Sequence, residues 1–96
     1  MTGTFAATAP QTTEWHLSLR LTESGDLTTA HAELTTAAAH LQADGQALRS
    51  PHDQPTSLIG DELAAGRALA DLGHQLIRAG AVAAEAAESA RRRDAG

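Results

Sequence analysis

The sequence contains no cysteine, which excludes disulfides, thiolate–metal sites and thiol chemistry. Lysine is also absent: all seven basic residues are arginine, and the net charge is −5. An acidic chain is poorly suited to the phosphate backbone, because binding there depends on clustered cations. The charge balance therefore disfavours nucleic acid as the partner.

Long hydrophobic runs are missing as well. No segment approaches the roughly 18 apolar residues that a membrane span needs. The first residues, "MTGTFAATAPQTT", have neither a basic region nor a sustained apolar stretch, so they do not resemble a secretory signal. We therefore expect no membrane association and a cytoplasmic location.

Large apolar side chains are few. Alanine accounts for 22 of the roughly 40 hydrophobic residues, which leaves about 18 larger ones. A chain of 96 residues forms one domain at most, and small domains often need staples or a partner. Since disulfides are excluded, the thin core predicts a homodimer.

The first regular pattern follows a tail at residues 1–12, which we expect to be flexible. Apolar residues then occupy every second position, as in a strand with one buried face: Trp15, Leu17, Leu19 and Leu21. A hairpin turning at Ser24–Gly25 would pair residues whose numbers sum to 49. That register places Trp15 in the core opposite Leu34 and puts His16 opposite Glu33 on the other face.

Residues 28–43 can be interpreted in two ways. Their composition favours a helix that ends near Gly45. The alternative is a strand, a turn at "AAAH" and a third strand from Leu41 to Arg49, with Leu41, Ala43, Gly45 and Ala47 toward the core. Propensity favours the helix and the hairpin register favours the strands, so the pattern alone leaves both open.

A long helix follows the loop "SPHDQPTS". One of its stripes contains Ile59, Leu63, Gly66, Ala70, Gly73 and Ile77. A neighbouring stripe, which we predict to contact a partner or a second copy, contains Leu58, Leu69, Leu72 and Leu76. Glycine costs a helix roughly 1 kcal/mol relative to alanine. We therefore expect Gly66 and Gly73 to let the helix approach the sheet or another helix closely.

The polar side of this helix carries Arg67 and Asp71, an expected i,i+4 pair. Asp61 and Glu62 suit the positive end of the helix dipole in the first turn. Residues 81–96 are helical or frayed in this interpretation, with a favourable Glu88–Arg92 pair.

Several segments together resemble a small actinobacterial family of unknown function. They are Trp15 in its strand, "GQALRSP" at 45–51 and "IGDELAAGRALADL" at 59–72. The resemblance covers Glu14 to Ala79, although the family pattern has proline directly before the isoleucine and here "TSL" separates Pro55 from Ile59. It implies an α+β fold of the double-stranded-RNA-binding-domain (dsRBD) class, in which a three-stranded antiparallel sheet packs on one long C-terminal helix. The domain would span residues 13–80, and the strand interpretation of 28–43 would be correct.

The same resemblance extends to the folded domain of ribosome hibernation factors and implies a role in stress or dormancy. It supplies no catalytic residues, and the sequence contains no nucleophile motif or phosphate-binding loop. We expect no enzyme activity and no cofactor.

Two sets of residues remain as candidates for other chemistry. His16, His31 and Glu33 could bind zinc or nickel if they share the outer face of the hairpin, although a solvated polar face explains them as well. The cluster of Arg91, Arg92 and Arg93 could contact RNA or a ribosome, but cations also suit a helix end. The sequence thus favours a non-enzymatic, homodimeric interaction protein, with ribosome or RNA binding and weak metal binding as alternatives.

Overall fold

The turn between the first two strands determines how the whole sheet is aligned. The computed structural model describes residues 9–49 and 57–95. Strands β1 (Leu17–Ser24) and β2 (Leu27–Thr35) are joined by Gly25 and Asp26. Gly25 has φ +62, and Asp26 does not have a positive φ. A positive φ at the first turn residue alone is typical of a type II′ hairpin, which favours glycine there.

This turn moves the register by two residues from the predicted one. Leu17, Leu19 and Leu21 pair with Leu34, Ala32 and Ala30, so the numbers sum to 51 and not to 49. A shift of two keeps every side chain on its predicted face. It also leaves Trp15 beyond the end of β1 with 55% of its surface exposed, so its predicted place in the core is wrong.

Residues 28–43 form strands, as the family resemblance implied. Strand β3 (His40–Leu48) pairs antiparallel with β2, and the sheet order is β1-β2-β3. The hydroxyl of Thr36 accepts hydrogen bonds from the N–H groups of Ala38 and Ala39 in the connecting turn. At the opposite end, the Arg49 guanidinium lies 2.7 Å from the Asp26 carboxylate and ties β3 to the first turn.

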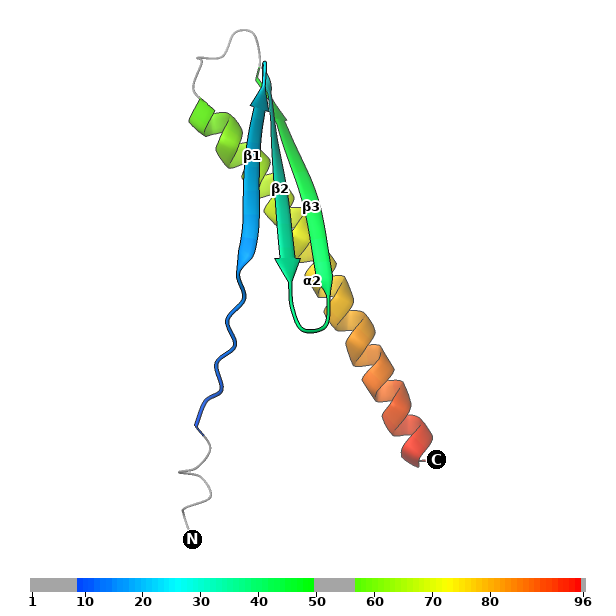
Figure 1. The fold of residues 1–96 in the computed structure, drawn as a ribbon. Helices are drawn as coiled ribbons and strands as arrows, with labels where there is room; N and C mark the ends of the chain where they lie inside the picture. Colours follow the sequence, from blue (N-terminus) through cyan, green and yellow to red (C-terminus); the bar gives the residue numbers. More distant parts are fainter. Residues whose placement is uncertain (1–8, 50–56, 96) are drawn as a thin grey trace.

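The core between sheet and helix consists mostly of alanine. Helix α2 (Ser57–Ala95) crosses one face of the sheet (Figure 1). The buried apolar residues are Ala30, Ala32, Leu34, Ala43, Ala47, Ala64, Ala68 and Leu72. The fold is therefore α+β, with a three-stranded antiparallel sheet packed on one long C-terminal helix, as predicted.

Glycine permits the close approach of helix and sheet, but at a strand position. A Cβ atom on Gly45 of β3 would strike the backbone of Ala64 and Ala68 and lie 2.9 Å from Cβ of Arg67. At Gly66 and Gly73 an added Cβ would meet nothing within 4 Å. Gly66 and Gly73 therefore do not provide the predicted close approach to the sheet, while the alternative, close approach to another helix, stays a prediction. They lie on the other side of a helix whose sheet-facing stripe is Ala64, Ala68 and Leu72.

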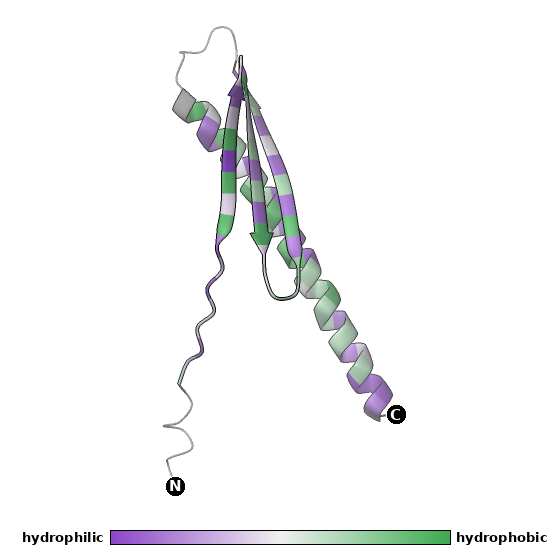
Figure 2. Ribbon diagram, in the orientation of Figure 1, coloured by the Kyte–Doolittle hydropathy of each residue, from purple (hydrophilic) through white to green (hydrophobic). Residues whose placement is uncertain are grey.

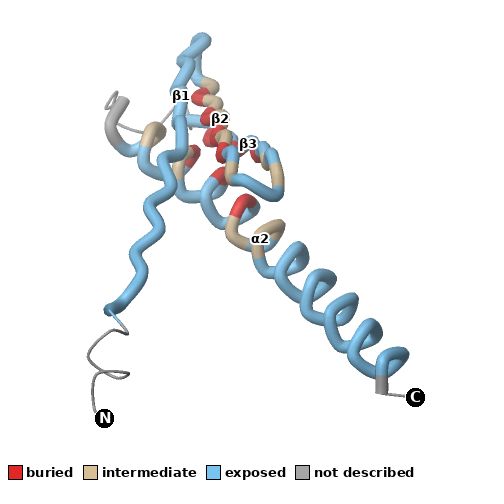
Figure 3. The backbone as a smooth tube through the Cα atoms, turned by 60° about the horizontal axis from the view of Figure 1, so that its bottom comes forward, coloured by how far each residue is buried: buried red, intermediate tan, exposed pale blue. Residues whose placement is uncertain are grey.

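The helix covers β2 and β3 and leaves most of β1 open. Figure 3 shows buried positions only where α2 crosses the sheet, and every residue of β1 is exposed. Beyond Ile77, α2 extends away from the sheet as an exposed rod and continues through Gly80 to Ala95. The predicted Glu88–Arg92 pair forms on this extension at 3.1 Å. Among the described residues, no helix combines the length and the apolarity needed to cross a bilayer.

Candidate interaction surface

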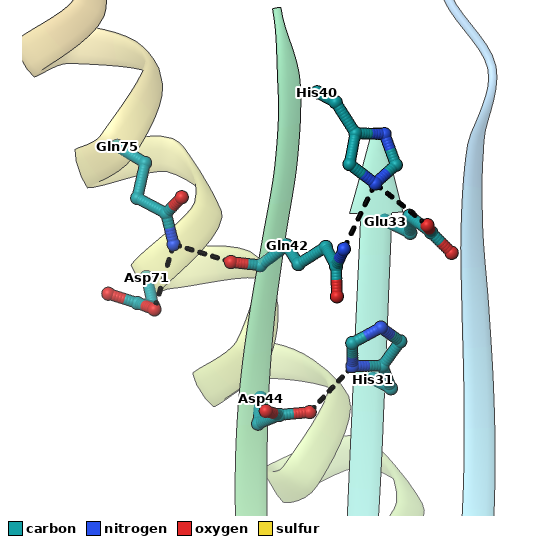
Figure 4. Close-up of polar contacts among 7 residues, drawn as sticks. All are labelled: His31, Glu33, His40, Gln42, Asp44, Asp71 and Gln75. Carbon is teal, nitrogen blue, oxygen red and sulfur yellow. Dashed lines mark hydrogen bonds and ion pairs between the residues drawn. The ribbon is translucent and has the colours of Figure 1, made fainter. Parts of the chain in front are cut away.

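The outer face of the sheet carries two histidine–carboxylate pairs between strands (Figure 4). Nδ1 of His31 lies 2.7 Å from Oδ1 of Asp44, and Nε2 of His40 lies 2.9 Å from Oε2 of Glu33. The side-chain nitrogen of Gln42 approaches the same His40 nitrogen at 3.0 Å. Exposed cross-strand pairs of this kind contribute roughly 0.2–1 kcal/mol each. They hold β2 and β3 in register and leave the face polar.

The three candidate metal ligands are not brought together. The register places Arg20 opposite His31 and Ser18 opposite Glu33, while His16 precedes β1 and contacts Glu14 at 3.1 Å. Within residues 9–49 and 57–95, no group of three His, Cys, Asp or Glu side chains could hold a metal ion. The predicted set fails because it depended on a hairpin register that differs by two residues.

Asp44 and His40 complete these pairs, and the sequence interpretation did not single them out. His40 was expected in a turn but begins β3. Each lies directly beside a core position of β3 and so has the opposite parity, which was the signal that could have placed both on the outer face. His74 is exposed on α2, and His52 lies outside the described residues.

Side chains of α2 cover the outer edge of β3, the edge that pairs with no strand in the described part of the chain. The Arg67 guanidinium donates to the carbonyl of Gln46, and Nε2 of Gln75 donates to the carbonyl of Gln42 at 2.7 Å. The same Gln75 nitrogen lies 3.2 Å from Oδ2 of Asp71, as Figure 4 shows. Arg67 and Asp71 therefore contact other groups, and the predicted ion pair between them is not formed. Covering an edge strand in this way limits its pairing with other chains.

The opposite edge, along β1, is open and apolar on its inner side. Leu17, Leu19 and Leu21 are 46%, 37% and 40% exposed, although they share a sheet face with buried residues of β2. We call these three leucines the β1 patch. Figure 2 shows the alternation of hydrophobic and hydrophilic residues along β1 that places them together. The helix that should cover them passes over β2 and β3.

The predicted partner contacts on α2 divide between core and surface. Leu72 is buried in the core, so it is not available to a partner. Leu76 is partly buried against the same core, so only part of its side chain is available. Leu69 remains 40% exposed. It lies about 200° around the helix from Arg67, which reaches the β3 edge, and therefore faces the β1 side. Leu58 lies outside the residues whose side chains are described.

A second apolar stripe of α2 points away from the sheet. Ile59, Leu63 and Ile77 are 60%, 48% and 70% exposed, and Gly66 lies between them. The sequence interpretation assigned this stripe to the sheet or to another helix, and the structure shows that it does not face the sheet. Helix α2 is thus apolar on two sides, and within residues 9–49 and 57–95 only one of them packs against the sheet.

The charged candidates lie at the two ends of the helix. Arg91, Arg92 and Arg93 are exposed at the hydrophilic end of α2 (Figure 2), and Arg92 pairs with Glu88. Asp61 and Glu62 lie in the second turn and not in the first, because α2 begins at Ser57. The arginines are remote from the sheet, so they form no common surface with the histidine pairs (Figure 1).

Comparisons with known proteins agree with this architecture. The chain is 32% identical to the protein in the crystal structure of Rv2632c, with a TM-score of 0.77 over 83% of this chain and 95% of that one. In sequence it is 40% identical over 60 residues to Rv2632c of Mycobacterium tuberculosis, described as uncharacterised. This match spans 62% of the chain and 64% of the relative's length, which is less than two thirds.

A further relative supports the same group. The uncharacterised protein Mb1767 of Mycobacterium bovis is 36% identical over 64 residues, which span 67% of this chain and 68% of the relative. None of these descriptions mentions a hibernation factor or an activity. The family model described as Rv2632c-like matches residues 13–93, and the chain therefore belongs to the Rv2632c-like family.

Proposed function

We propose that this protein is a non-enzymatic interaction protein that works as a homodimer, with the β1 patch at its interface. The observation that supports this most is the row of three half-exposed leucines on the core side of β1, left uncovered by α2. Large exposed apolar surfaces on soluble proteins mark sites of interaction. A cytoplasmic location and a role in stress or dormancy belong to the same proposal: the first rests on the lack of a signal-like or membrane-spanning segment in the sequence, and the second on the resemblance described above.

The size of the patch predicts a weak dimer. Full burial of a leucine is worth about 1.5–3 kcal/mol, so burying the exposed 37–46% of each leucine gives about 1 kcal/mol apiece. The six leucines of two copies then contribute about 5 kcal/mol, whereas a Kd of 1 μM corresponds to about 8 kcal/mol. Further contacts must therefore contribute. Two exposed apolar residues lie near the patch: Trp15 precedes β1, and Leu69 faces the β1 side from α2.

Light scattering over a concentration series from about 1 μM to about 1 mM tests the proposal, because the expected affinity lies in this range. We expect the average mass to rise from that of the 9.9 kDa monomer toward twice that value. A mass that stays at the monomer value at every concentration would contradict the homodimer.

A second candidate function, ribosome or RNA binding, is favoured by the exposed arginines at the end of α2. Co-sedimentation with ribosomes at two salt concentrations tests it, since electrostatic binding is strongest at low salt. We expect replacement of Arg91–Arg93 by glutamine to abolish any such binding, with Arg78→Gln as a control on the same helix. Absence of binding at low salt would exclude this candidate.

A further inference from the structure

The hydrogen-bonding edges of the sheet show which backbone groups of β1 are free. The carbonyls of Gln42 and Gln46 accept bonds from α2, so even-numbered residues of β3 direct their backbone groups outward. Because the direction alternates along antiparallel strands, the even-numbered residues of β2 pair with β3 and the odd-numbered ones pair with β1. In β1, the outward groups therefore belong to Leu17, Leu19, Leu21 and Glu23, of which the three leucines form the β1 patch.

The two edges of the sheet differ in how they are protected. Arg67 and Gln75 cover the β3 edge, whereas within the described residues β1 has a strand on one side only. Of the devices that hinder edge pairing, the eight residues of β1 include no proline, and their only charged residues are Arg20 and Glu23. The same residues of β1 thus carry both the unpaired backbone groups at the sheet edge and the exposed leucine side chains on its inner face.

We infer that β1 pairs antiparallel with β1 of a second copy, to give a six-stranded sheet with both helices on one face. This inference rests on the proposed homodimer and assigns its interface. An edge of eight residues is about 27 Å long. With the leucine side chains it offers on the order of 400 Å² per copy, about half of a standard interface. That area fits a weak dimer of identical chains.

Charge and side-chain matching select among the registers that the free backbone groups allow. Paired numbers must have an even sum, because only odd-numbered residues bond outward. A sum of 40 places Arg20 opposite its own copy and Leu17 opposite the partner's Glu23, so like charges meet on the outer face. A sum of 36 leaves only three residues of β1 paired with β1.

Sums of 42 and 44 place Leu19 or Leu21 opposite Glu23 of the partner subunit, and a sum of 46 places Glu23 opposite its own copy. A sum of 38 avoids all of these problems. It places Leu19 opposite Leu19 of the partner subunit at the two-fold axis and Leu17 opposite Leu21 of the partner subunit. On the outer face it places Arg20 opposite Ser18 of the partner subunit, so no like charges meet. We therefore assign the register centred on Leu19.

The cysteine-free chain allows a direct test by single substitution. Leu19→Cys should form an interchain disulfide on mild oxidation, because directly opposed residues meet the Cα separation of 4.4–6.8 Å that a disulfide requires. Ser18→Cys and Arg20→Cys should not, because each would be displaced by two positions from its copy, about 8 Å away. Gly73→Cys tests the alternative that two copies dimerise through the second apolar stripe of α2, which points away from the sheet.

The outcomes separate this inference from the homodimer itself. Each variant is first compared with the unmodified protein by circular dichroism and light scattering. A dimer in which Leu19→Cys cross-links fastest supports the inference. A dimer in which Ser18→Cys or Arg20→Cys cross-links fastest overturns the register, and one in which Gly73→Cys does so overturns the β1 interface while the homodimer stands. A monomer at all concentrations overturns both proposals.

Discussion

Replacement of Gly45 by alanine should destabilise the fold more than any other single methyl addition to its glycines. The added Cβ would meet the backbone of Ala64 and Ala68, which cannot rotate aside as a side chain can. The whole helix would have to move away from β3, which would open gaps around the alanines of the core. Overpacking of a core usually costs about 1–3 kcal/mol, and contact with backbone places Gly45→Ala toward the upper end of that range.

Other effects of the same substitution act in the opposite direction but are smaller. Removing glycine from a strand gains about 0.5–1 kcal/mol of chain entropy, and a buried methyl group gains about 0.8 kcal/mol. We therefore expect a net destabilisation of about 1–2 kcal/mol. In a domain of this size each kcal/mol lowers Tm by about 4–8 °C.

Thermal and urea unfolding followed by circular dichroism measure this effect, with Gly66→Ala as the matched control. An added Cβ at Gly66 meets nothing within 4 Å, so alanine there should raise stability by up to about 1 kcal/mol through helix propensity. The two substitutions add the same methyl group and should have opposite signs. A Gly45→Ala protein as stable as the unmodified one would refute the close approach of α2 to β3.

Three further predictions concern the helix. Leu72→Ala should cost about 2–5 kcal/mol because Leu72 is buried in the core, whereas Leu69→Ala should cost less than about 1 kcal/mol in the monomer; equal losses in urea unfolding would contradict the assigned helix orientation. Removal of residues 81–96 should leave Tm within a few degrees of its original value, since that segment does not contact the sheet, and a large fall measured by calorimetry would show that it does. Gln75→Ala should cost about 0.5–1.5 kcal/mol and increase aggregation on heating, because it uncovers the β3 carbonyl of Gln42; unchanged turbidity and stability would contradict a protective role.

The sequence predicted the strands well because their alternation has a period that survives small errors. The turn was placed one residue too early, and the register changed by two, yet each apolar residue of β1 kept its sheet face. Gly25 decides the turn, because the first residue of this hairpin adopts a positive φ. The same error led to the predictions of Trp15 in the core and of His16 beside Glu33. The predicted side-chain neighbours were therefore wrong, whereas the predicted fold class was correct.

The orientation of α2 could not be read from the same pattern. Large apolar residues occur on two sides of the helix, and the larger ones at Ile59, Leu63 and Ile77 point to solvent. The buried stripe is mostly alanine, and alanine also occupies many exposed positions of α2, such as Ala70 and Ala79, so it does not mark the buried face. Only Gly45 on the facing strand, where the sequence did place the core, indicates that the helix must pack there through its smallest residues.

The candidate surface was predicted in part for the same reason. The leucines of β1 were identified as an apolar row, but their exposure depends on where α2 crosses the sheet, which no local pattern determines. Of the four leucines predicted on the helix, the structure leaves Leu69 exposed and buries Leu72. The partner surface that we propose therefore lies on β1, whereas the sequence interpretation had placed it on the helix.

Light scattering of Leu19→Glu beside Val82→Glu tests the central claim most directly. Both substitutions replace an exposed apolar residue by the same acid, but only Leu19 lies in the β1 patch, while Val82 is 65% exposed on the free end of α2. We predict that the unmodified protein and Val82→Glu show the same rise in mass with concentration, and that Leu19→Glu remains monomeric with an unchanged circular dichroism spectrum. Equal dimerisation of all three proteins would contradict an interface at β1.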